Sequence, residues 1–347
     1  MSYLRGAGMS QTSHRSQSLG QASACPPGST LDARPSTLAT RRRFIRTVVP
    51  AAAGFGLAAG AAGQALGGAG FAPPIAVFSK VYQELNLDFE QSAAVTAEAG
   101  LDGVDCAVRS GGEIAPERAA EQMPRYAEAL RRRGVGMLLL TTGILGVSSA
   151  QAGEVLRTGK GLGIRYYRLG YWSHRPGRPA EELLAEIHSS LKDLAEMNKE
   201  LGVCAVYQNH SAGKDRSRRN AGGDLAELYE MVKDLAPEQV GVAFDLGHAL
   251  LEHGERWREH FERLKPHIRV AYIKDVQRGS GFVPFGQGEF GRAGFFQLLA
   301  RMNYRAPLSM HIEYEWAPPG QKTRQALVQG LKESRRVLGQ WLAAAGG

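Results

Sequence analysis

The sequence predicts an α/β protein built as a single (β/α)8 TIM barrel, and three observations point to this fold. From Phe71 onward, short apolar runs typical of buried strands alternate with amphipathic segments typical of helices. There are eight such runs, about 33 residues apart on average, and eight strand–helix units close into a barrel. The 282 residues from position 66 to the end also match the roughly 250 residues of a typical barrel of this kind.

The expected strands are apolar runs that end in polar residues. They begin near Ile75, Gly103, Val135, Ile164, Cys204, Gly241, Ile268 and Pro307. Because strands and helices alternate, the sheet is expected to be parallel. An open doubly wound sheet is the alternative, but it would need a Gly-rich phosphate turn after the first strand, and none follows Lys80.

Four segments between or after these runs carry clear helix signals. Asp88–Ala99 begins with an Asp that can cap a helix and has acidic residues in its first turn. Ala119–Arg133 has apolar residues at helical spacing and three Arg at its end. Pro179–Gly202 is long and amphipathic, and Arg324–Ala345 closes the chain. No linker interrupts residues 71–347, so we expect one barrel domain there.

Residues 1–65 are expected to form a leader, disordered or helical, ahead of the barrel. Residues 1–39 are rich in Ser, Gly, Pro and Thr and have no apolar period. Arg41–Arg46 (RRRFIR) and the weakly apolar run behind it resemble a twin-arginine export signal, with cleavage expected near Gly63-Gln64-Ala65. A membrane anchor is the alternative, although the run is Gly-rich and shorter than the ~20 apolar residues of a spanning helix.

The leader changes how the charge of the protein is interpreted. Seven Arg and one Asp of the leader account for most of the net charge of +8, and residues 66–347 keep 35 basic and 33 acidic residues. The charge therefore gives no reason to expect a nucleic-acid partner. We expect an exported, periplasmic protein that meets the twin-arginine translocase through its leader.

The cysteines do not indicate a zinc site. There is no CxxC pair and no Cys/His zinc spacing. Cys106 and Cys204 lie in apolar strand runs, where a free thiol behaves as a small buried hydrophobic group. A disulfide between them remains open at this stage, because it requires the two strands to lie close together.

Polar side chains gather at the ends of the last four expected strands, and in a (β/α)8 barrel such ends form the site. The strand ends carry Gln208 with His210, Asp245 with His248, Lys274, and His311 with Glu313. Alternation along a strand places Gln208 and His210 on one face of their strand, and His311 and Glu313 on one face of theirs. The sequence thus predicts that the four strand ends converge on one cavity.

Several motifs, which follow one another along the chain in the order typical of the family, resemble the sugar phosphate isomerase/epimerase family. That family has a xylose isomerase-like barrel. The similarity covers about Ile75 to Trp316. It rests on Gly103–Glu117 (GVDCAVRSGGEIAPE), Tyr167–Trp172 (YRLGYW), the NHS after Gln208, FDLGH around Asp245, IKD followed by VPFGQGEF, and the final HIEYE.

The resemblance implies one divalent metal, Mn, Mg or Zn, held by Glu, Asp, His and Glu at four strand ends. The corresponding positions here are Gln208, Asp245, one at or near Tyr272, and Glu313, so the first and third ligands depart from the pattern. Three possibilities stay open: an ordinary metal site, weak binding by two carboxylates, or a metal-free site in which Lys274 is the electrophile.

Proton abstraction next to a carbonyl is the chemistry that the resemblance implies, on a keto sugar or a sugar acid. Such chemistry needs a base and a cation that stabilises the enediolate. Glu313 is the expected base, and Lys274 or a metal is the expected oxyanion stabiliser. Gln208 cannot take a proton, so a one-base isomerisation or an elimination is favoured over a two-base epimerisation.

The expected substrate-binding residues are His210, His248, Arg109 and Trp172. His210 and His248 match positions that usually contact sugar hydroxyls in the family. Arg109 either binds substrate or pairs with an acidic neighbour, and Trp172 either stacks on a sugar ring or packs internally.

The loop after the seventh strand carries its own signals. Asp275 is expected to cap that loop, and Gly286-Gln287-Gly288 is expected to form a turn or a phosphate cradle.

The alternatives to an isomerase are an exported non-catalytic carbohydrate-binding barrel, a lyase that eliminates from oxidised sugars, and an abasic-site endonuclease. The near-neutral mature charge disfavours the last. The oligomeric state is not indicated.

Overall fold

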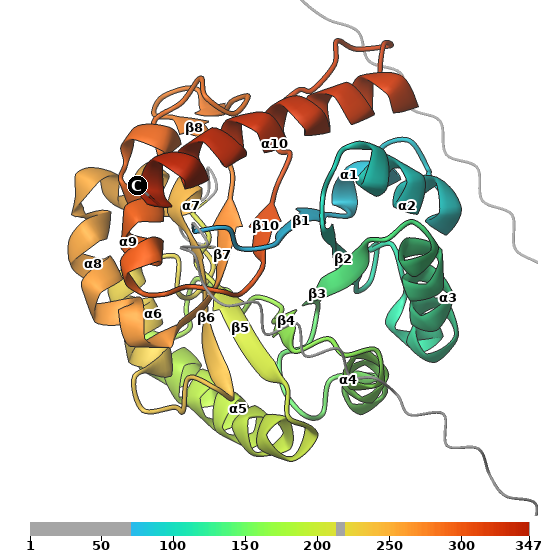
Figure 1. Ribbon diagram of the computed structural model, residues 1–347. Coiled ribbons are helices and arrows are strands. Elements are labelled where there is room, and N and C mark those ends of the chain that lie inside the picture. Colours follow the sequence, from blue (N-terminus) through green and yellow to red (C-terminus); the bar gives the residue numbers. More distant parts are fainter. Residues whose placement is uncertain (1–70, 213–218, 347) are drawn as a thin grey trace, which may run out of the picture. The chain divides into compact units, whose positions relative to one another are not determined.

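Eight parallel strands close into a barrel in the computed structural model, which describes residues 71–212 and 219–346 (Figure 1). Around the barrel the strand order is β1-β10-β7-β6-β5-β4-β3-β2, so each strand pairs with its neighbours in the sequence and the last pairs with the first. This confirms the predicted (β/α)8 TIM barrel. The predicted leader and its twin-arginine signal lie outside the described residues.

The barrel strands begin where the apolar runs begin, to within one or two residues. They are β1 (Ile75–Phe78), β2 (Gly103–Val108), β3 (Gly136–Thr142), β4 (Tyr166–Arg168), β5 (Cys204–Gln208), β6 (Val240–Asp245), β7 (Ile268–Ile273) and β10 (Leu308–Met310). A small antiparallel ribbon, β8 (Val276–Gln277) with β9 (Gly281–Phe282), lies in the loop after β7.

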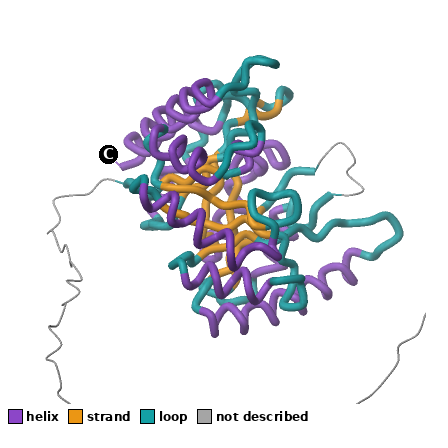
Figure 2. The backbone as a smooth tube through the Cα atoms, turned by 90° about the vertical axis from the view of Figure 1, so that its right-hand side faces the viewer, coloured by secondary structure: helices purple, strands orange, loops and turns teal. Residues whose placement is uncertain are grey.

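Helices follow the strands and cover the outside of the barrel, as Figures 1 and 2 show. They are α1 (Lys80–Gln83), α2 (Phe89–Glu98), α3 (Ala119–Arg132), α4 (Ala152–Gly161), α5 (Ala180–Leu201), α6 (Leu225–Val232), α7 (Leu246–His253), α8 (Trp257–Leu264), α9 (Phe295–Arg301) and α10 (Arg324–Gly346). The four predicted helices all form. Asp88 caps α2 by accepting a hydrogen bond from the Gln91 N–H at 2.8 Å, while the Gln91 side chain accepts from the Asp88 N–H at 3.0 Å.

The hydrophobic core has two parts, as expected for a barrel with helices outside. The larger part lies between strands and helices, and the smaller part fills the barrel with side chains such as Val206, Val270 and Tyr272. Cys106 and Cys204 are both buried and both free. The open question of a disulfide between them is thereby answered, because each thiol fills its own part of the core.

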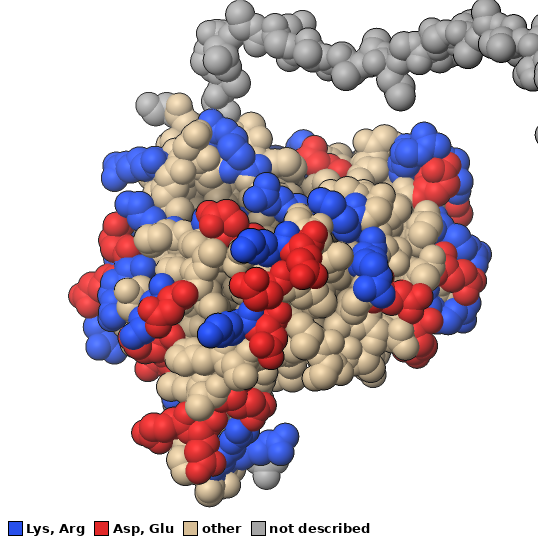
Figure 3. All heavy atoms as spheres, turned by 90° about the horizontal axis from the view of Figure 1, so that it is seen from below, with Lys and Arg blue, Asp and Glu red and all other residues tan. Residues whose placement is uncertain are grey.

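The surface carries charges of both signs. On the face shown in Figure 3, Lys and Arg side chains are interspersed with Asp and Glu. Several surface ion pairs of the protein join residues three positions apart in the sequence, such as Arg118 with Glu121 at 2.7 Å and Lys233 with Glu230 at 2.6 Å. Within residues 71–212 and 219–346, no helix is both long enough and apolar enough to cross a membrane.

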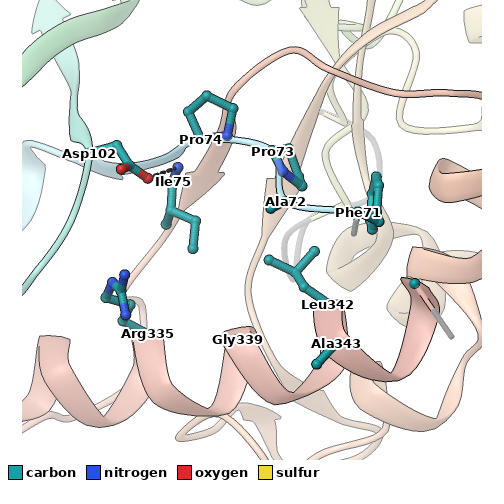
Figure 4. Close-up of a pocket in the computed structure, with 11 residues that line it drawn as sticks. Phe71, Ala72, Pro73, Pro74, Ile75, Asp102, Arg335, Gly339, Leu342 and Ala343 are labelled. Atoms are coloured by element: carbon teal, nitrogen blue, oxygen red, sulfur yellow. Dashed lines mark hydrogen bonds between the residues drawn. The ribbon is translucent and has the colours of Figure 1, made fainter. Parts of the chain in front are cut away.

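A cavity of about 670 Å³ lies at the amino ends of the strands, between the start of β1 and α10 (Figure 4). Its wall is mainly apolar, with Phe71, Ile75 and Leu342 among the lining residues, and Asp102 uses its carboxylate to accept the Ile75 N–H at 2.8 Å. Although it is larger than the cavity at the other end, it holds no group of catalytic side chains. We therefore place the functional site elsewhere.

Glu113, which follows β2, should make stability depend on pH. Its Oε1 is buried without a hydrogen-bond partner in the described structure, although part of the residue reaches solvent. Burial raises the pKa of Glu113 from 4.5 to about 7, with partial opposition from the hydroxyls of Ser79, Tyr126 and Ser92. Between pH 4.5 and about 7 the folded protein binds more protons than the unfolded chain. The free energy of unfolding therefore falls by about 3 kcal/mol as the pH rises through this range.

Glu113→Gln should remove that dependence and stabilise the protein above neutral pH. The check is chemical denaturation at mildly acidic and mildly alkaline pH, with the exposed Glu117→Gln as the control. Equal pH slopes in wild type and Glu113→Gln would contradict the assignment.

Candidate functional site

A polar cavity of about 440 Å³ opens at the carboxyl ends of the strands. Residues at or just after the end of every barrel strand except β6 contribute to its wall. The lining residues are Phe78, Lys80, Arg109, Thr142, Gly143, Leu145, Arg168, Gly170, Tyr171, Gln208, His210, Lys274, His311 and Glu313. Gln208, Lys274 and Glu313 therefore share one cavity, as the sequence predicts, while Asp245 lies beneath its floor.

Asp245 ends β6 and is completely buried. One carboxylate oxygen, Oδ1, accepts the His248 N–H at 3.1 Å and so caps α7. The other oxygen, Oδ2, accepts from Gln208 Nε2 at 2.7 Å and lies 3.1 Å from Lys274 Nζ. Asn209 holds the Asp245 backbone through two hydrogen bonds of 2.8 Å. Asp245 thus orients other side chains and does not itself reach the cavity.

Lys274 follows β7 directly and brings its ammonium group to the centre of the site. Its Nζ lies 3.1 Å from Asp245 Oδ2, 3.1 Å from His248 Nε2 and 3.4 Å from Glu313 Oε1. These three acceptors match the three N–H donors of an ammonium. The stem of Lys274 passes against Gly247, where a Cβ would come within 2.7 Å of Lys274 Cγ. The glycine of the FDLGH motif thus leaves room for the lysine.

The protonation states follow from these contacts. Burial alone would lower the pKa of Lys274, but the charges of Asp245 and Glu313 outweigh it and raise the pKa. Burial and the Lys274 charge hold the pKa of His248 well below its usual range. Because the ammonium can only donate, His248 Nε2 accepts, and His248 Nδ1–H donates to Ser211 Oγ at 2.9 Å.

Glu313 is the carboxylate that faces the cavity, with about a quarter of its side chain exposed. Burial would raise its pKa, but His311 and Lys274 lower it well below its usual range, so Glu313 is ionised at neutral pH. His311 Nδ1 lies 3.6 Å from Glu313 Oε1, and the His311 ring stacks on Phe78 with 4.6 Å between centroids. Neither ring nitrogen of His311 has a hydrogen-bond partner among the described residues.

Gln208 ends β5 and uses both ends of its amide. Its Nε2 donates to Asp245, and its Oε1 accepts the hydroxyl of Tyr171. A glutamate at this position would face the buried Asp245 carboxylate, so the neutral amide suits the neighbour that the structure shows. Tyr272, the other position that departs from the family pattern, is buried inside the barrel against His311.

The residues present do not fit the divalent metal that the resemblance implies. Lys274 Nζ lies between Asp245 and Glu313, the two carboxylates expected to hold the metal, and supplies the positive charge there. The carbonyl oxygen of Gln208 already accepts a hydrogen bond from Tyr171. No group of three or more His, Cys, Asp or Glu in the described part of the chain could hold a metal ion. Of the three possibilities left open by the sequence, the geometry favours the ammonium site.

Removal of metals should therefore leave the protein unchanged. We expect substoichiometric metal in elemental analysis, and equal melting temperature and ligand binding before and after dialysis against a chelator. The physical reason is that an ammonium already neutralises both carboxylates, and a cation next to it would be repelled. A stoichiometric metal whose loss lowers the melting temperature would contradict this interpretation.

Two further expectations about substrate contacts are corrected by burial. Trp172 is 5% exposed, packs on Tyr207 and is not part of the cavity wall. His248 is 2% exposed and lies behind Lys274, with its ring 3.9 Å from that of His210. His210 and Arg109 do line the cavity. The alternation of polar and apolar residues along a strand does not distinguish polar side chains that line the cavity from those that lie behind the lining residues and hold them in place.

The structure also adds residues that the sequence reasoning passed over. Arg168 ends β4 and lines the cavity beside Tyr171, whose ring centroid is 4.7 Å from the guanidinium carbon. Lys80 lines it after β1. The rule that identified the last four strand ends, a polar residue where an apolar run stops, also applies to Arg168.

The loop after β7 is organised by Asp275, as predicted. Its Oδ2 accepts the N–H groups of Gly286 and Gly288 at 2.8 and 3.0 Å, and its Oδ1 accepts those of Val276 and Phe290. A Cβ on Gly288 would come within 2.3 Å of Asp275 Oδ1. Because these N–H groups bind the carboxylate, the GQG segment is a turn and not a phosphate cradle.

Fold and site together define a TIM-barrel protein with a charged polar site at the carboxyl ends of its strands. Residues 93–336 match the family described as xylose isomerase-like TIM barrel, and the chain belongs to that family. A search of curated proteins found no match.

Solved structures with the same fold are distant in sequence. A 3-keto-D-glucoside 4-epimerase from E. coli is 15% identical, with a TM-score of 0.56 over 76% of this chain and all of the other. An L-ribulose 3-epimerase is 18% identical, with a TM-score of 0.56 over 79% of this chain and 96% of the other. An IolI protein with a bound zinc atom is 16% identical, with a TM-score of 0.59 over 77% of this chain and 99% of the other. At these identities the likeness establishes the fold.

Proposed function

We propose that the protein is a sugar isomerase/epimerase-like enzyme that removes a proton next to the carbonyl of a keto sugar or sugar acid. The observation that carries the proposal is the pair formed by the ionised Glu313 carboxylate and the Lys274 ammonium, 3.4 Å apart at the wall of one cavity. A base and a cation at this separation match what enolisation requires.

In the proposed step, Glu313 takes the proton from the carbon next to the carbonyl. The C–H electron pair forms the carbon–carbon double bond of the enediolate, and the carbonyl electron pair moves onto oxygen. Lys274 turns one N–H from Glu313, its longest contact, to that oxygen. As Glu313 loses this partner its basicity increases, because the Lys274 charge is one of the causes of its low pKa. The hydroxyl proton on the deprotonated carbon then moves to the enolate oxygen, and Glu313 returns the abstracted proton to the former carbonyl carbon. The carbonyl now stands on the carbon that was deprotonated, which completes an isomerisation.

The surrounding residues keep this pair in place. Asp245 and His248 bind the other two N–H groups of Lys274 from behind the wall, so the ammonium is fixed before substrate arrives. His311, with Nδ1 3.6 Å from Glu313 Oε1, is neutral because burial lowers its pKa, and it packs beside the carboxylate in the cavity wall. Two of the epimerases among the structural neighbours are named for a 3-keto-D-glucoside and for L-ribulose, which supports a keto sugar as the substrate class.

Solvent hydrogen exchange tests the proposal directly. The purified protein, incubated in D₂O with a panel of ketoses, keto glycosides and keto sugar acids, should introduce deuterium next to the carbonyl of at least one of them, detected by NMR. Binding without exchange across the panel would replace the proposal with the non-catalytic carbohydrate-binding barrel.

We further propose that the protein acts outside the cytoplasm, on the basis of the RRRFIR segment at Arg41–Arg46. Cell fractionation of the native host is the test. Replacement of Arg41–Arg43 by Lys should retain the protein in the cytoplasm if this segment is a twin-arginine signal, and unchanged fractionation would contradict the assignment.

A further inference from the structure

The arginines in the cavity have no carboxylate partner. Lys274 is balanced by Asp245 and Glu313, but no carboxylate of the described residues forms an ion pair with Arg168 or Arg109. Arg168 is 6% exposed, and its Nη1 is buried without a hydrogen-bond partner. The Nε of Arg109 is likewise buried and unpartnered. A buried guanidinium whose N–H group lacks an acceptor is costly, so Arg168, with the partly exposed Arg109 in the same cavity, calls for an explanation.

Neighbouring groups favour the charged form of Arg168 without binding its Nη1. Burial alone would lower the pKa of Arg168, but Tyr171 and the Asp105 carboxylate, among other groups, outweigh it and raise the pKa. The Asp105 oxygens accept hydrogen bonds from Thr141 at 2.9 Å and Ser309 at 2.7 Å, and no ion pair joins Asp105 to Arg168 among the described residues. The Tyr171 ring contacts the guanidinium, with its centroid 4.7 Å from the Arg168 guanidinium carbon. Burial and repulsion from Arg168 lower the pKa of Arg109, which agrees with two guanidinium groups close together.

We propose that Arg168 and Arg109 form an anion subsite, and that the substrate is a sugar carrying an oxyanion, either a carboxylate or a phosphate ester. The guanidinium fork matches both groups in a two-pronged geometry. The subsite and the Lys274–Glu313 pair line the same cavity, so one ligand can have its oxyanion on the arginines and its carbonyl at Lys274. Lys80 in the same wall adds a further positive charge. This inference deepens the proposed function, on which it rests for the sugar part of the ligand.

Direct binding tests the subsite without requiring turnover. Isothermal titration of the full chain should compare D-fructose, D-fructuronate and a D-fructose phosphate ester, which are neutral, a carboxylate and a phosphate. We expect an anionic ligand to bind about 10- to 100-fold more tightly than fructose, as expected for charge-assisted hydrogen bonds. The tighter of the two anions identifies the oxyanion. Equal affinity for all three, or no measurable binding of either anion, would overturn the proposal.

Arg168→Met isolates the contribution of the guanidinium. It should remove the anion preference, reduce the affinity for the preferred anion about 10- to 100-fold and leave the affinity for fructose unchanged. Arg165→Met is the matched control, since Arg165 is an exposed residue just before the same strand and the substitution changes the net charge equally.

The outcomes separate the two proposals. Tight anion binding without solvent hydrogen exchange leaves the subsite standing and refutes the isomerase. Exchange on a neutral keto sugar with no anion preference refutes the subsite alone. A large fall in the melting temperature of Arg168→Met, with anion binding retained, would mean that Arg168 has a structural role and would likewise overturn the subsite.

Discussion

Replacing Glu313 with Gln is expected to lower kcat by about two to four orders of magnitude, because the amide cannot accept the substrate proton. KM should change little, since the amide keeps the shape and one acceptor oxygen of the carboxylate. The melting temperature at neutral pH should fall, because the ionised carboxylate stabilises the folded state, but only modestly, since Lys274 keeps Asp245 as its charged partner at 3.1 Å. Turnover and solvent hydrogen exchange measured on the substrate found in the D₂O screen are the readouts.

Glu315→Gln is the matched control for this substitution. Glu315 lies two residues further along, is 59% exposed and pairs with Lys322 at 2.8 Å outside the cavity. Its replacement should leave turnover intact. Undiminished kcat in Glu313→Gln would exclude Glu313 as the base.

The acidity of Glu313 also shapes the pH profile. Because the pKa of Glu313 lies below its ordinary value of 4.5, the carboxylate stays ionised as pH falls through that value. A base must be unprotonated, so kcat/KM, which reports the pKa of the free protein, should show no decline with a carboxyl pKa near 4.5 while the protein remains folded. The same shift stabilises the folded state above the unfolded pKa, and this stabilisation is lost as the pH falls through the lower folded pKa.

Lys274→Met is expected to abolish turnover and to destabilise the protein by about 3–5 kcal/mol. Activity is lost because methionine cannot donate to the enediolate oxygen. Stability falls because the completely buried Asp245 keeps its charge but loses the ammonium at 3.1 Å. Turnover, solvent hydrogen exchange and denaturation midpoints measure both effects.

The double variant Lys274→Met/Asp245→Asn separates these two losses. It removes both members of the buried pair, so stability should recover substantially while turnover remains absent. Turnover in either variant near the wild-type level would exclude Lys274 as the oxyanion stabiliser. A double variant no more stable than Lys274→Met would contradict the assignment of the buried ion pair.

The sequence predicts which strand ends form the site. It places Gln208, Lys274 and Glu313 in one cavity, because parallel strands of a closed barrel have all their carboxyl ends on one side. Burial separated residues that the pattern treats alike, since Asp245 and His248 support Lys274 from behind the wall. Trp172 likewise packs against Tyr207 in the core. Strand alternation predicts the direction of a side chain but not how deeply it is buried.

The sequence alone determined the architecture of this protein. Eight apolar runs with capped amphipathic helices between them specify a (β/α)8 barrel, because each local periodicity admits one way to bury its apolar face. Tertiary structure decided the charge of the site. Lys274, Asp245 and Glu313 are remote in the chain, and only their meeting shows that an ammonium lies between the two carboxylates. It likewise decided that Arg168 and Arg109 lack a carboxylate partner among the described residues, because ion pairing depends on distances that closure of the barrel sets.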